Sequence, residues 1–415
     1  MWPMRIVIVC DPGSVDGGAA KVAISSARGL ADASLPVDFV CTAGPIAPQL
    51  QHPNIAVHCL NMASVWAKAN PLAAAAQGIW NGSARTQFEN ILKGLPAGQT
   101  VVHFHQWTKS FSPSVLAAPS QLGMASIVSL HDYFLACPNG AYYRFSDAAP
   151  CTRTPMSSAC LVTACDRSSS LHKAVRVARQ YATAKALGRA GSSLSVLSVS
   201  PFAQKVIDSF IPRQHRRFMV RSPIDIAKEE PVGVGGNSQL VFVGRMTAEK
   251  GVRQLAQAGR QAGLPVTFVG DGPLLEEISA FGEPIRCTGW LDASGVDAAL
   301  RQARALVFPS TWYETGGLVV LEALARGIPV IVSRATAAAE FVVDGQNGFV
   351  VDAGDMPALT ARMHALTDKA AVERMGRQAF DRYWADPQSM PAHIANLLVV
   401  YNAILDDRRV PASAA

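Results

Sequence analysis

Short runs of β-branched and aliphatic residues alternate with longer stretches rich in Ala, Leu, Arg and Gln, and this alternation constrains the fold most strongly. It is typical of βα units and parallel sheets. The strands expected in the first half are Arg5–Cys10, Val37–Cys41, Ala56–Leu60, Val101–His105, Ile127–Leu130 and Leu194–Val199. A second series comprises Leu240–Val243, Val266–Val269, Ile285–Cys287, Ala305–Phe308 and Pro329–Val332. Two such series predict an α/β protein with two Rossmann-like domains.

The boundary between the domains is expected just before Pro223, because proline favours an extended connection there. We therefore predict an N-terminal domain over residues 1–222 and a C-terminal domain over residues 223–390. A final helix is expected over residues 391–409, where apolar residues recur with a 3.6-residue period at Ile394, Leu397, Leu398, Tyr401, Ile404 and Leu405. This helix either packs on its own domain or returns to the N-terminal domain.

The net charge of +6 is distributed unevenly along the chain. Residues 1–222 contain 20 Lys and Arg against 9 Asp and Glu, whereas residues 223–415 contain 17 against 22. The basic half is expected to meet an anionic partner such as a lipid phosphate or a membrane surface, unless it is simply a solvated surface. Nucleic acid is not expected, because the chain has no repeat of aromatic and basic residues for base stacking.

The location predicted from the sequence is cytoplasmic, with peripheral contact at the inner face of the cell membrane. No apolar run approaches the roughly 20 residues that span a bilayer, and Ile6–Cys10 is too short for the core of a signal peptide. The stretch Leu171–Arg189 reads as a helix with Lys173, Arg176, Lys185 and Arg189 among Ala and Val. Such a basic helix suits a membrane surface and a lipid-linked acceptor, and a solvated helix face is the alternative.

Two segments of the second half suggest a site for a nucleoside diphosphate. In Leu240–Gly251 a strand runs into Gly244, with Arg245 and Lys250 close behind to neutralise charge on leaving phosphates. In Phe308–Ala325 two carboxylates flank a turn that opens a helix, where backbone N–H groups can face a diphosphate. The residues of this second segment that we assign to the site are Glu314, Gly316, Gly317, Leu318, Val319 and Glu322.

These motifs together resemble the family 4 retaining glycosyltransferases of GT-B fold, in which two Rossmann-like domains face a deep cleft. Glu314 and Glu322 match the family's Glu-x7-Glu motif, and Gly244, Arg245, Lys250 and Gly251 match its Gly-Arg-x4-Lys-Gly loop. Further matches are Val269–Pro273, Thr288–Trp290 and Asp344–Phe349, so the resemblance covers about residues 240–350. One departure is Gly316-Gly317, where the family often has Phe-Gly.

The resemblance implies transfer of a sugar from a UDP- or GDP-sugar to an acceptor hydroxyl, with retention of configuration and without a required metal. Arg245 and Lys250 would then stabilise the departing diphosphate, Glu322 would bind ribose hydroxyls, and Glu314 would lie near the sugar. The expected acceptor is a lipid-linked or polysaccharide intermediate of bacterial surface glycan synthesis. The alternatives are a non-catalytic, transferase-like scaffold and a nicotinamide-dependent oxidoreductase built on Gly270-Asp-Gly272, which lacks the third glycine of that motif.

The first half resembles the family at fewer positions. Gly17 and Gly18 follow the first strand, where the family keeps a glycine loop facing the donor phosphates and the acceptor, although most such glycines only form turns. His131 stands in the His-Asp pair after a later strand and would bond the donor sugar or the reacting centre; an interior histidine is the alternative. His103 and His105 share one face of their strand, and His105 is a candidate for the acceptor site.

Four cysteines are concentrated in an insertion over about residues 137–170. They are Cys137, Cys151, Cys160 and Cys165. Four thiolates could form a tetrahedral structural zinc site, although the paired Cys-x2-Cys spacing of such sites is missing. Inert buried thiols and a redox or iron–sulfur role are the alternatives.

Overall fold

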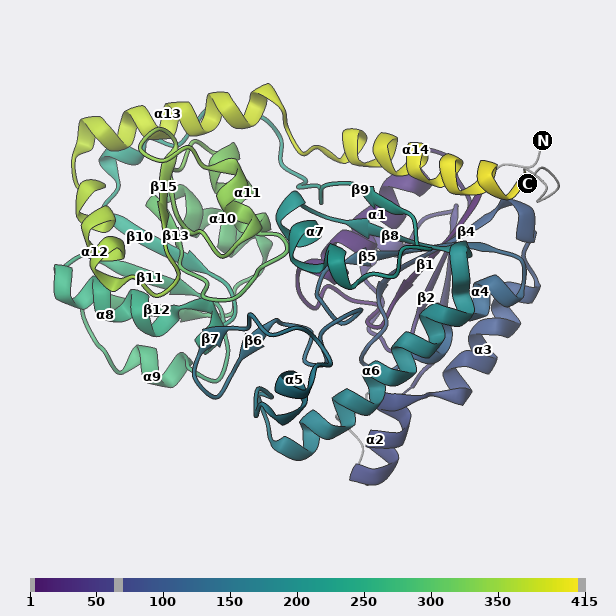
Figure 1. Ribbon diagram of the computed structural model, residues 1–415. Coiled ribbons are helices and arrows are strands. Elements are labelled where there is room, and N and C mark those ends of the chain that lie inside the picture. The colour runs from purple at the N-terminus through teal and green to yellow at the C-terminus, as the bar shows by residue number, and fades with distance from the viewer. Residues whose placement is uncertain (1–3, 63–69, 410–415) are drawn as a thin grey trace. The chain divides into compact units, whose positions relative to one another are not determined.

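The computed structural model describes residues 4–62 and 70–409, which form two compact units (Figure 1). Unit 1 contains the described residues within 1–141, 153–223 and 389–415. Unit 2 contains residues 142–152 and 224–388. The insertion around the four cysteines is therefore divided, because its residues 142–152 belong to unit 2.

Unit 1 is built on a parallel sheet with the strand order β3-β2-β1-β4-β5-β8-β9. The strands are β1 (Arg5–Cys10), β2 (Val37–Cys41), β3 (Ile55–Cys59), β4 (Thr100–Gln106), β5 (Ala125–Leu130), β8 (Leu194–Ser198) and β9 (Arg217–Met219). The central strands β1, β4 and β5 are buried along almost their whole length because helices cover a parallel sheet on both faces. The strand order reverses between β1 and β4, as in the doubly wound Rossmann fold.

The helices of unit 1 are α1 (Gly18–Asp32), α2 (Pro71–Ile79), α3 (Gly82–Lys93), α4 (Ala118–Gln121), α5 (Ser158–Val162), α6 (Ser170–Ala190), α7 (Pro201–Ile207) and α14 (Met390–Arg409). Local signals set several of their starts. Asn81 accepts a hydrogen bond from the N–H of Ala84 at the start of α3, and Ser200 does the same for Ala203 ahead of Pro201 in α7.

Helix α14 belongs to unit 1 although it follows all of unit 2 in the sequence (Figure 1). It packs beside α1, and its buried apolar residues join the core of the first sheet. His393 at its start lies with Nε2 2.9 Å from Oγ of Ser26 in α1. The final helix therefore returns to the first unit, which is one of the two placements expected from its periodicity.

Unit 2 contains a second parallel sheet with the order β12-β11-β10-β13-β14-β15 and one small antiparallel hairpin. The strands are β10 (Gln239–Val243), β11 (Val266–Val269), β12 (Ile285–Gly289), β13 (Ala303–Phe308), β14 (Val330–Ser333) and β15 (Gly348–Val351), and the hairpin pairs β6 (Tyr143–Arg144) with β7 (Ala149–Pro150). The helices are α8 (Val252–Ala262), α9 (Leu275–Ser279), α10 (Ala293–Arg301), α11 (Leu318–Ala325), α12 (Met356–Ala365) and α13 (Lys369–Ala385). Here the order reverses between β10 and β13, so both units have Rossmann topology.

Candidate active site

The candidate donor site of unit 2 lies at the carboxyl ends of β10 and β13. Ligands of open α/β sheets bind where the strand order reverses, and these are the two strands at that point. The loop after β10 extends from Gly244 to Gly251, and the loop after β13 extends from Pro309 to Gly317. The N–H of Thr311 donates to the carbonyl of Glu249 over 2.8 Å, so the two loops are joined through their backbones.

Lys250 and Glu314 form an ion pair across these loops. Nζ of Lys250 lies 2.6 Å from Oε1 and 2.8 Å from Oε2 of Glu314. The two side chains are only 10% and 15% exposed, so the pair is largely shielded from water. Because both carboxylate oxygens are engaged, the pair has one defined geometry rather than a mobile surface contact. Two of the residues predicted from the motifs therefore lie together.

Arg245 differs from Lys250 in its surroundings. Its carbonyl accepts the N–H of Thr247 over 2.9 Å, but its side chain is exposed and forms no hydrogen bond or ion pair with any residue in the ranges 4–62 and 70–409. A guanidinium presents a planar set of donors that matches phosphate oxygens. Arg245 is therefore free to meet an anion from outside the protein.

Helix α11 begins directly after Gly316 and Gly317. Its first backbone hydrogen bonds run from Val320 (2.9 Å) and Leu321 (3.4 Å) to the carbonyl of Gly317. The N–H groups of Leu318 and Val319 precede these bonds, at the end of the helix that carries partial positive charge. Such helix starts bind phosphate groups. Glu322 follows in the second turn and is half-buried, so the two motif carboxylates lie on either side of the helix start.

The Gly270-Asp271-Gly272 segment packs against the loop after β10. A Cβ atom added at Gly270 would lie 2.0 Å from the carbonyl oxygen of Gly244. The N–H of Met246 also donates to the carbonyl of Asp271 over 2.8 Å. These glycines therefore allow two backbone segments to approach closely, which accounts for the motif without a dinucleotide.

Tyr143 is a contributor to this site that the sequence analysis missed. It stands in the hairpin β6–β7, is 1% exposed, and its hydroxyl lies 3.1 Å from Oγ1 of Thr311. Burial, the largest influence, raises the pKa of Tyr143, and the Thr311 bond partly offsets it. The hairpin thus supports the loop that carries Glu314. No short-range pattern could have indicated this contact, because 168 positions separate the two residues.

In unit 1, a buried carboxylate organises the loops at the corresponding edge of the sheet. Asp11 follows β1, is 2% exposed, and accepts N–H donors from Lys109, Ser110 and Phe111 over 2.7–3.0 Å. Burial raises its pKa, although these three bonds oppose the rise. Gly17 caps the start of α1 with a φ of +96°, and Gly18 is the first residue of that helix. The two predicted glycines therefore lie at the carboxyl end of β1.

Three histidines lie together beside this edge. Nδ1 of His105 lies 2.9 Å from Nε2 of His131, and their rings stack with centroids 5.1 Å apart. Nδ1 of His103 lies 2.7 Å from the hydroxyl of Tyr401 in α14. Burial lowers the pKa of His131 to about 4 and the pKa values of His103 and His105 well below their ordinary range. All three rings are therefore neutral at pH 7, and His131 can exchange hydrogen bonds there without carrying charge.

Asp132 and Arg179 extend this group. Burial raises the pKa of Asp132 to about 6, although Oδ1 accepts the N–H of Phe134 over 3.0 Å and the charge of Arg179 opposes the shift. Arg179 of α6 is 8% exposed, donates to the carbonyl of Pro138 over 3.2 Å, and lies 4.4 Å from the ring centroid of Phe134. Arg179 therefore holds the segment that follows His131.

The four cysteines of the insertion are free thiols. Sγ of Cys137 lies 3.1 Å from Oδ1 of Asn139, and Sγ of Cys165 lies 2.8 Å from Nζ of Lys173. Cys151 lies in unit 2, whereas the other three lie in unit 1. Among the described residues, no group of three or more His, Cys, Asp or Glu side chains could hold a metal ion. The predicted zinc site therefore has no support in this part of the chain.

The basic helix predicted over Leu171–Arg189 is α6, but it is only partly the cationic surface that we expected. Lys173 is 5% exposed and donates to the carbonyl of Cys160 over 3.0 Å, and Arg176 pairs with the buried Asp166 at 2.7 Å. These cations face inward because the preceding segment offers them a carbonyl and a carboxylate. Lys185 and Arg189 are exposed. No helix within the described ranges is both long and apolar enough to cross a membrane.

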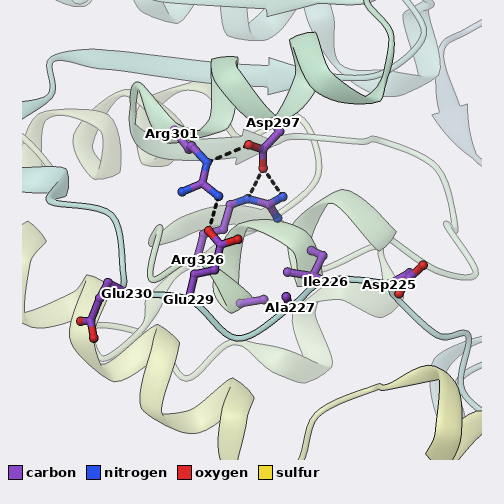
Figure 2. Close-up of a pocket in the computed structure, with 9 residues that line it drawn as sticks. Asp225, Ile226, Ala227, Glu229, Glu230, Asp297, Arg301 and Arg326 are labelled. Atoms are coloured by element: carbon purple, nitrogen blue, oxygen red, sulfur yellow. Dashed lines mark hydrogen bonds and ion pairs between the residues drawn. The ribbon is translucent and has the colours of Figure 1, made fainter.

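Unit 2 also contains a pocket of about 270 Å³, whose lining residues are drawn in Figure 2. Arg301, at the end of α10, bonds Asp297 and Glu229, and Arg326, which follows α11, also bonds Asp297. These positions precede β13 and β14, so the pocket opens at the amino-terminal edge of the sheet. It shares no lining residue with the loops that follow β10 and β13.

The chain is similar to known proteins in sequence and in fold. Residues 237–369 match the family model for glycosyl transferases group 1. A glycogen synthase of Mycobacterium tuberculosis is 30% identical over 276 residues, or 63% of this chain and 64% of that protein. The chain thus spans just under two thirds of the length of this curated relative. A GDP-mannose-dependent alpha-(1-6)-phosphatidylinositol monomannoside mannosyltransferase of Mycolicibacterium smegmatis is 29% identical over 196 residues, or 43% of this chain and 49% of that protein.

Among solved structures, Anabaena HepE in complex with UDP and glucose aligns with a TM-score of 0.67 at 15% identity, over 96% of this chain and 100% of that chain. At this identity the likeness concerns the fold. Both units of the present chain have the Rossmann topology of such proteins, and the final helix returns to the first unit. The chain therefore has the GT-B fold of nucleotide-sugar glycosyltransferases, and its residues 237–369 resemble glycosyl transferases group 1.

Proposed function

We propose that the chain transfers a sugar from a nucleoside-diphosphate sugar to an acceptor hydroxyl, as a family 4 glycosyltransferase. The observation that carries the proposal is the Lys250–Glu314 pair beside the start of α11, within the segment that resembles glycosyl transferases group 1. A diphosphate bound at the N–H groups of Leu318 and Val319 would lie next to cations that can neutralise its phosphates. It would also lie next to carboxylates that can accept hydrogen bonds from the hydroxyl groups of the sugar and the ribose.

Each motif residue has a role in this proposal. Arg245 contacts the diphosphate first, since its guanidinium is exposed and is not paired with any residue within 4–62 or 70–409. Lys250 stabilises the charge that develops on the leaving phosphate. Glu314 positions the sugar, and Glu322 accepts hydrogen bonds from the ribose. A UDP-sugar is a reasonable donor because HepE, of the same fold, binds UDP and glucose.

We further propose that the reaction retains the anomeric configuration and needs no metal ion. The two cations and the helix start together supply the positive charge that a divalent ion supplies elsewhere. The acceptor hydroxyl would attack from the face that the diphosphate leaves. In unit 1, Gly17, Gly18 and the neutral His131 would meet the donor and the acceptor.

The acceptor that we propose is a lipid-linked or polysaccharide intermediate, reached from the inner face of the cell membrane. The similar mannosyltransferase of M. smegmatis acts, by its name, on a phosphatidylinositol monomannoside. Lys185 and Arg189 are the exposed cations of α6 that could meet anionic lipid. Sedimentation with anionic liposomes tests this contact. A Lys185→Glu, Arg189→Glu double variant should bind less, and a wild-type protein that never sediments would contradict the membrane contact.

The donor is tested by a thermal-shift panel of UDP, GDP, ADP and their sugars, followed by assays of donor hydrolysis and transfer. We expect one nucleotide series to raise Tm and to be turned over in the presence of EDTA, with a product of unchanged anomeric configuration by NMR. Lys250→Ala and Glu322→Ala should each lower kcat/KM by about tenfold or more.

Arg253→Ala is the matched control, because Arg253 is the second residue of α8, just after the loop, but pairs with Glu277 at the surface. This variant should turn over donor like the wild type. Wild-type protein that binds and hydrolyses none of the nucleotides would contradict the proposed function. Lys250→Ala and Glu322→Ala variants with wild-type kinetics would contradict the assignment of the site.

A further inference from the structure

The carboxylate of Glu314 is held by more than Lys250. Oε2 of Glu314 also accepts the hydroxyl of Ser310 over 3.1 Å and the indole N–H of Trp312 over 3.1 Å. Together with the two contacts to Lys250, both carboxylate oxygens are engaged. Hydrogen bonds to an ionised group are stronger than neutral ones, so each donor restricts where the carboxylate can point.

Trp312 contacts the other member of the ion pair as well. Nζ of Lys250 lies 5.4 Å from the centroid of the Trp312 ring and 5.6 Å from that of Phe308. A cation at these distances is attracted to an aromatic face, and more strongly where water is excluded. Lys250 is 8% exposed, so water is largely excluded from the surroundings of its ammonium. One side chain thus bonds the carboxylate by its N–H and faces the ammonium with its ring.

We infer that Trp312 is a positioning residue that aligns Glu314 and Lys250 for turnover, an inference that rests on the proposed function. Without the indole N–H, Glu314 keeps the bond from Lys250 and the weaker one from Ser310. The ion pair itself persists, but it can then shift as a unit relative to the loop that carries it. Small displacements of groups that orient a substrate reduce turnover more than binding. Trp312 therefore matters for kcat, and the affinity for a nucleotide without sugar should depend little on it.

The test is Trp312→Phe, which removes the N–H donor and keeps an aromatic ring, compared with Trp384→Phe. Trp384 is the matched control because its indole N–H donates to the carbonyl of Ala325 over 2.9 Å, elsewhere in the same unit. Steady-state turnover of the donor sugar and binding of the free nucleoside diphosphate are measured for both. We expect Trp312→Phe to lower kcat by roughly tenfold, with KM and nucleotide affinity within about twofold of wild type. Trp384→Phe should change Tm alone.

Kinetics of Trp312→Phe equal to those of the wild type, or equal to those of Trp384→Phe, would overturn the inference while leaving the proposed function standing. A second measurement does not require a donor. The indole N–H resonance of Trp312, identified by its loss in Trp312→Phe, should shift in Glu314→Gln because the acceptor loses its charge. An unchanged resonance would overturn the inference even if no nucleotide sugar is ever turned over. Failure of every nucleotide to bind, with the resonance shifting as expected, would instead reject the proposed function.

Discussion

Gly251 determines how closely the loops after β10 and β13 approach each other. Its φ is +73°, and a Cβ atom there would lie 2.2 Å from the carbonyl oxygen of Pro309. Gly251→Ala therefore combines left-handed strain with a backbone clash, and we expect it to lower the free energy of unfolding by more than about 3 kcal/mol. Gly263→Ala, at the other end of α8, has a similar φ of +64° but open space, and should cost only about 1 kcal/mol. Urea unfolding measures both, and equal losses would contradict the steric argument.

The sequence could predict the residues of the candidate donor site but not their pairing. The spacing of the motif residues indicates a local turn, so the turn at Gly317 and the start of α11 could be predicted from the sequence. The Lys250–Glu314 contact joins positions 64 apart, and the support from Tyr143 comes from another part of the chain. Such contacts depend on the register of the whole sheet, which local composition does not encode.

Helix α6 shows a limit of predicting helices from composition. Composition predicts a helix there, but exposure of its cations depends on what packs against it. Arg179→Met would leave two carbonyls without their donor and remove the contact with Phe134, so we expect a loss of about 2–3 kcal/mol in the free energy of unfolding. Arg189→Met, on the exposed face of the same helix, should cost less than about 0.5 kcal/mol. Chemical denaturation distinguishes them, and similar values would refute the buried role of Arg179.

Helix α14 should make unit 1 sensitive to acid. His393 is 6% exposed, and burial lowers its pKa to about 4, against an ordinary value near 6.5. The unfolded state therefore binds a proton at a higher pH than the folded state, and stability falls as pH drops from about 6.5 towards 4. From about pH 7 to about pH 5 the contribution of His393 is roughly 2 kcal/mol.

His393→Gln tests this, because glutamine keeps a hydrogen-bonding group near Ser26 and does not titrate in this range. Unfolding at both pH values should show a smaller loss on acidification in the variant than in the wild type. An identical pH dependence in the two proteins would exclude His393 as a source of the acid sensitivity.

Strand prediction found every central strand and two of the four edge strands, β3 and β12. All the strands expected from the sequence occur, because continuous burial leaves a clear pattern in β1 or β5. The edge strands β9 and β15 were missed: β9 has only 3 residues and no fully buried one, and β15 is no longer than the predicted β11 and β14, so length alone does not account for it. The hairpin β6–β7, with two-residue strands, forms within unit 2.

At the scale of the whole chain, the hydrophobic core of unit 1 requires residues of the C-terminal helix α14. Helix α14 contributes six buried apolar residues to that core: Ile394, Leu397, Val400, Tyr401, Ile404 and Leu405. At about 1.5–3 kcal/mol each, their burial is comparable with the net stability of a domain, about 5–15 kcal/mol. A chain ending at Gln388 should therefore lose the unfolding transition of unit 1 and keep that of unit 2. Calorimetry with limited proteolysis measures this, and two unchanged transitions would contradict it.

The division of the insertion between the two units also limits how the gene for this chain can recombine with related genes. Unit 2 consists of residues 142–152 and 224–388, so two separate stretches of the gene encode it. A single crossover near codon 223 would bring in the larger segment of a foreign unit 2 but not its hairpin with the counterpart of Tyr143, the residue that contacts Thr311 beside the candidate site. It would also replace the native α14, on which unit 1 depends. Exchange of unit 2 between related chains thus requires that the hairpin and residues 224–388 be transferred together while the final helix stays in place.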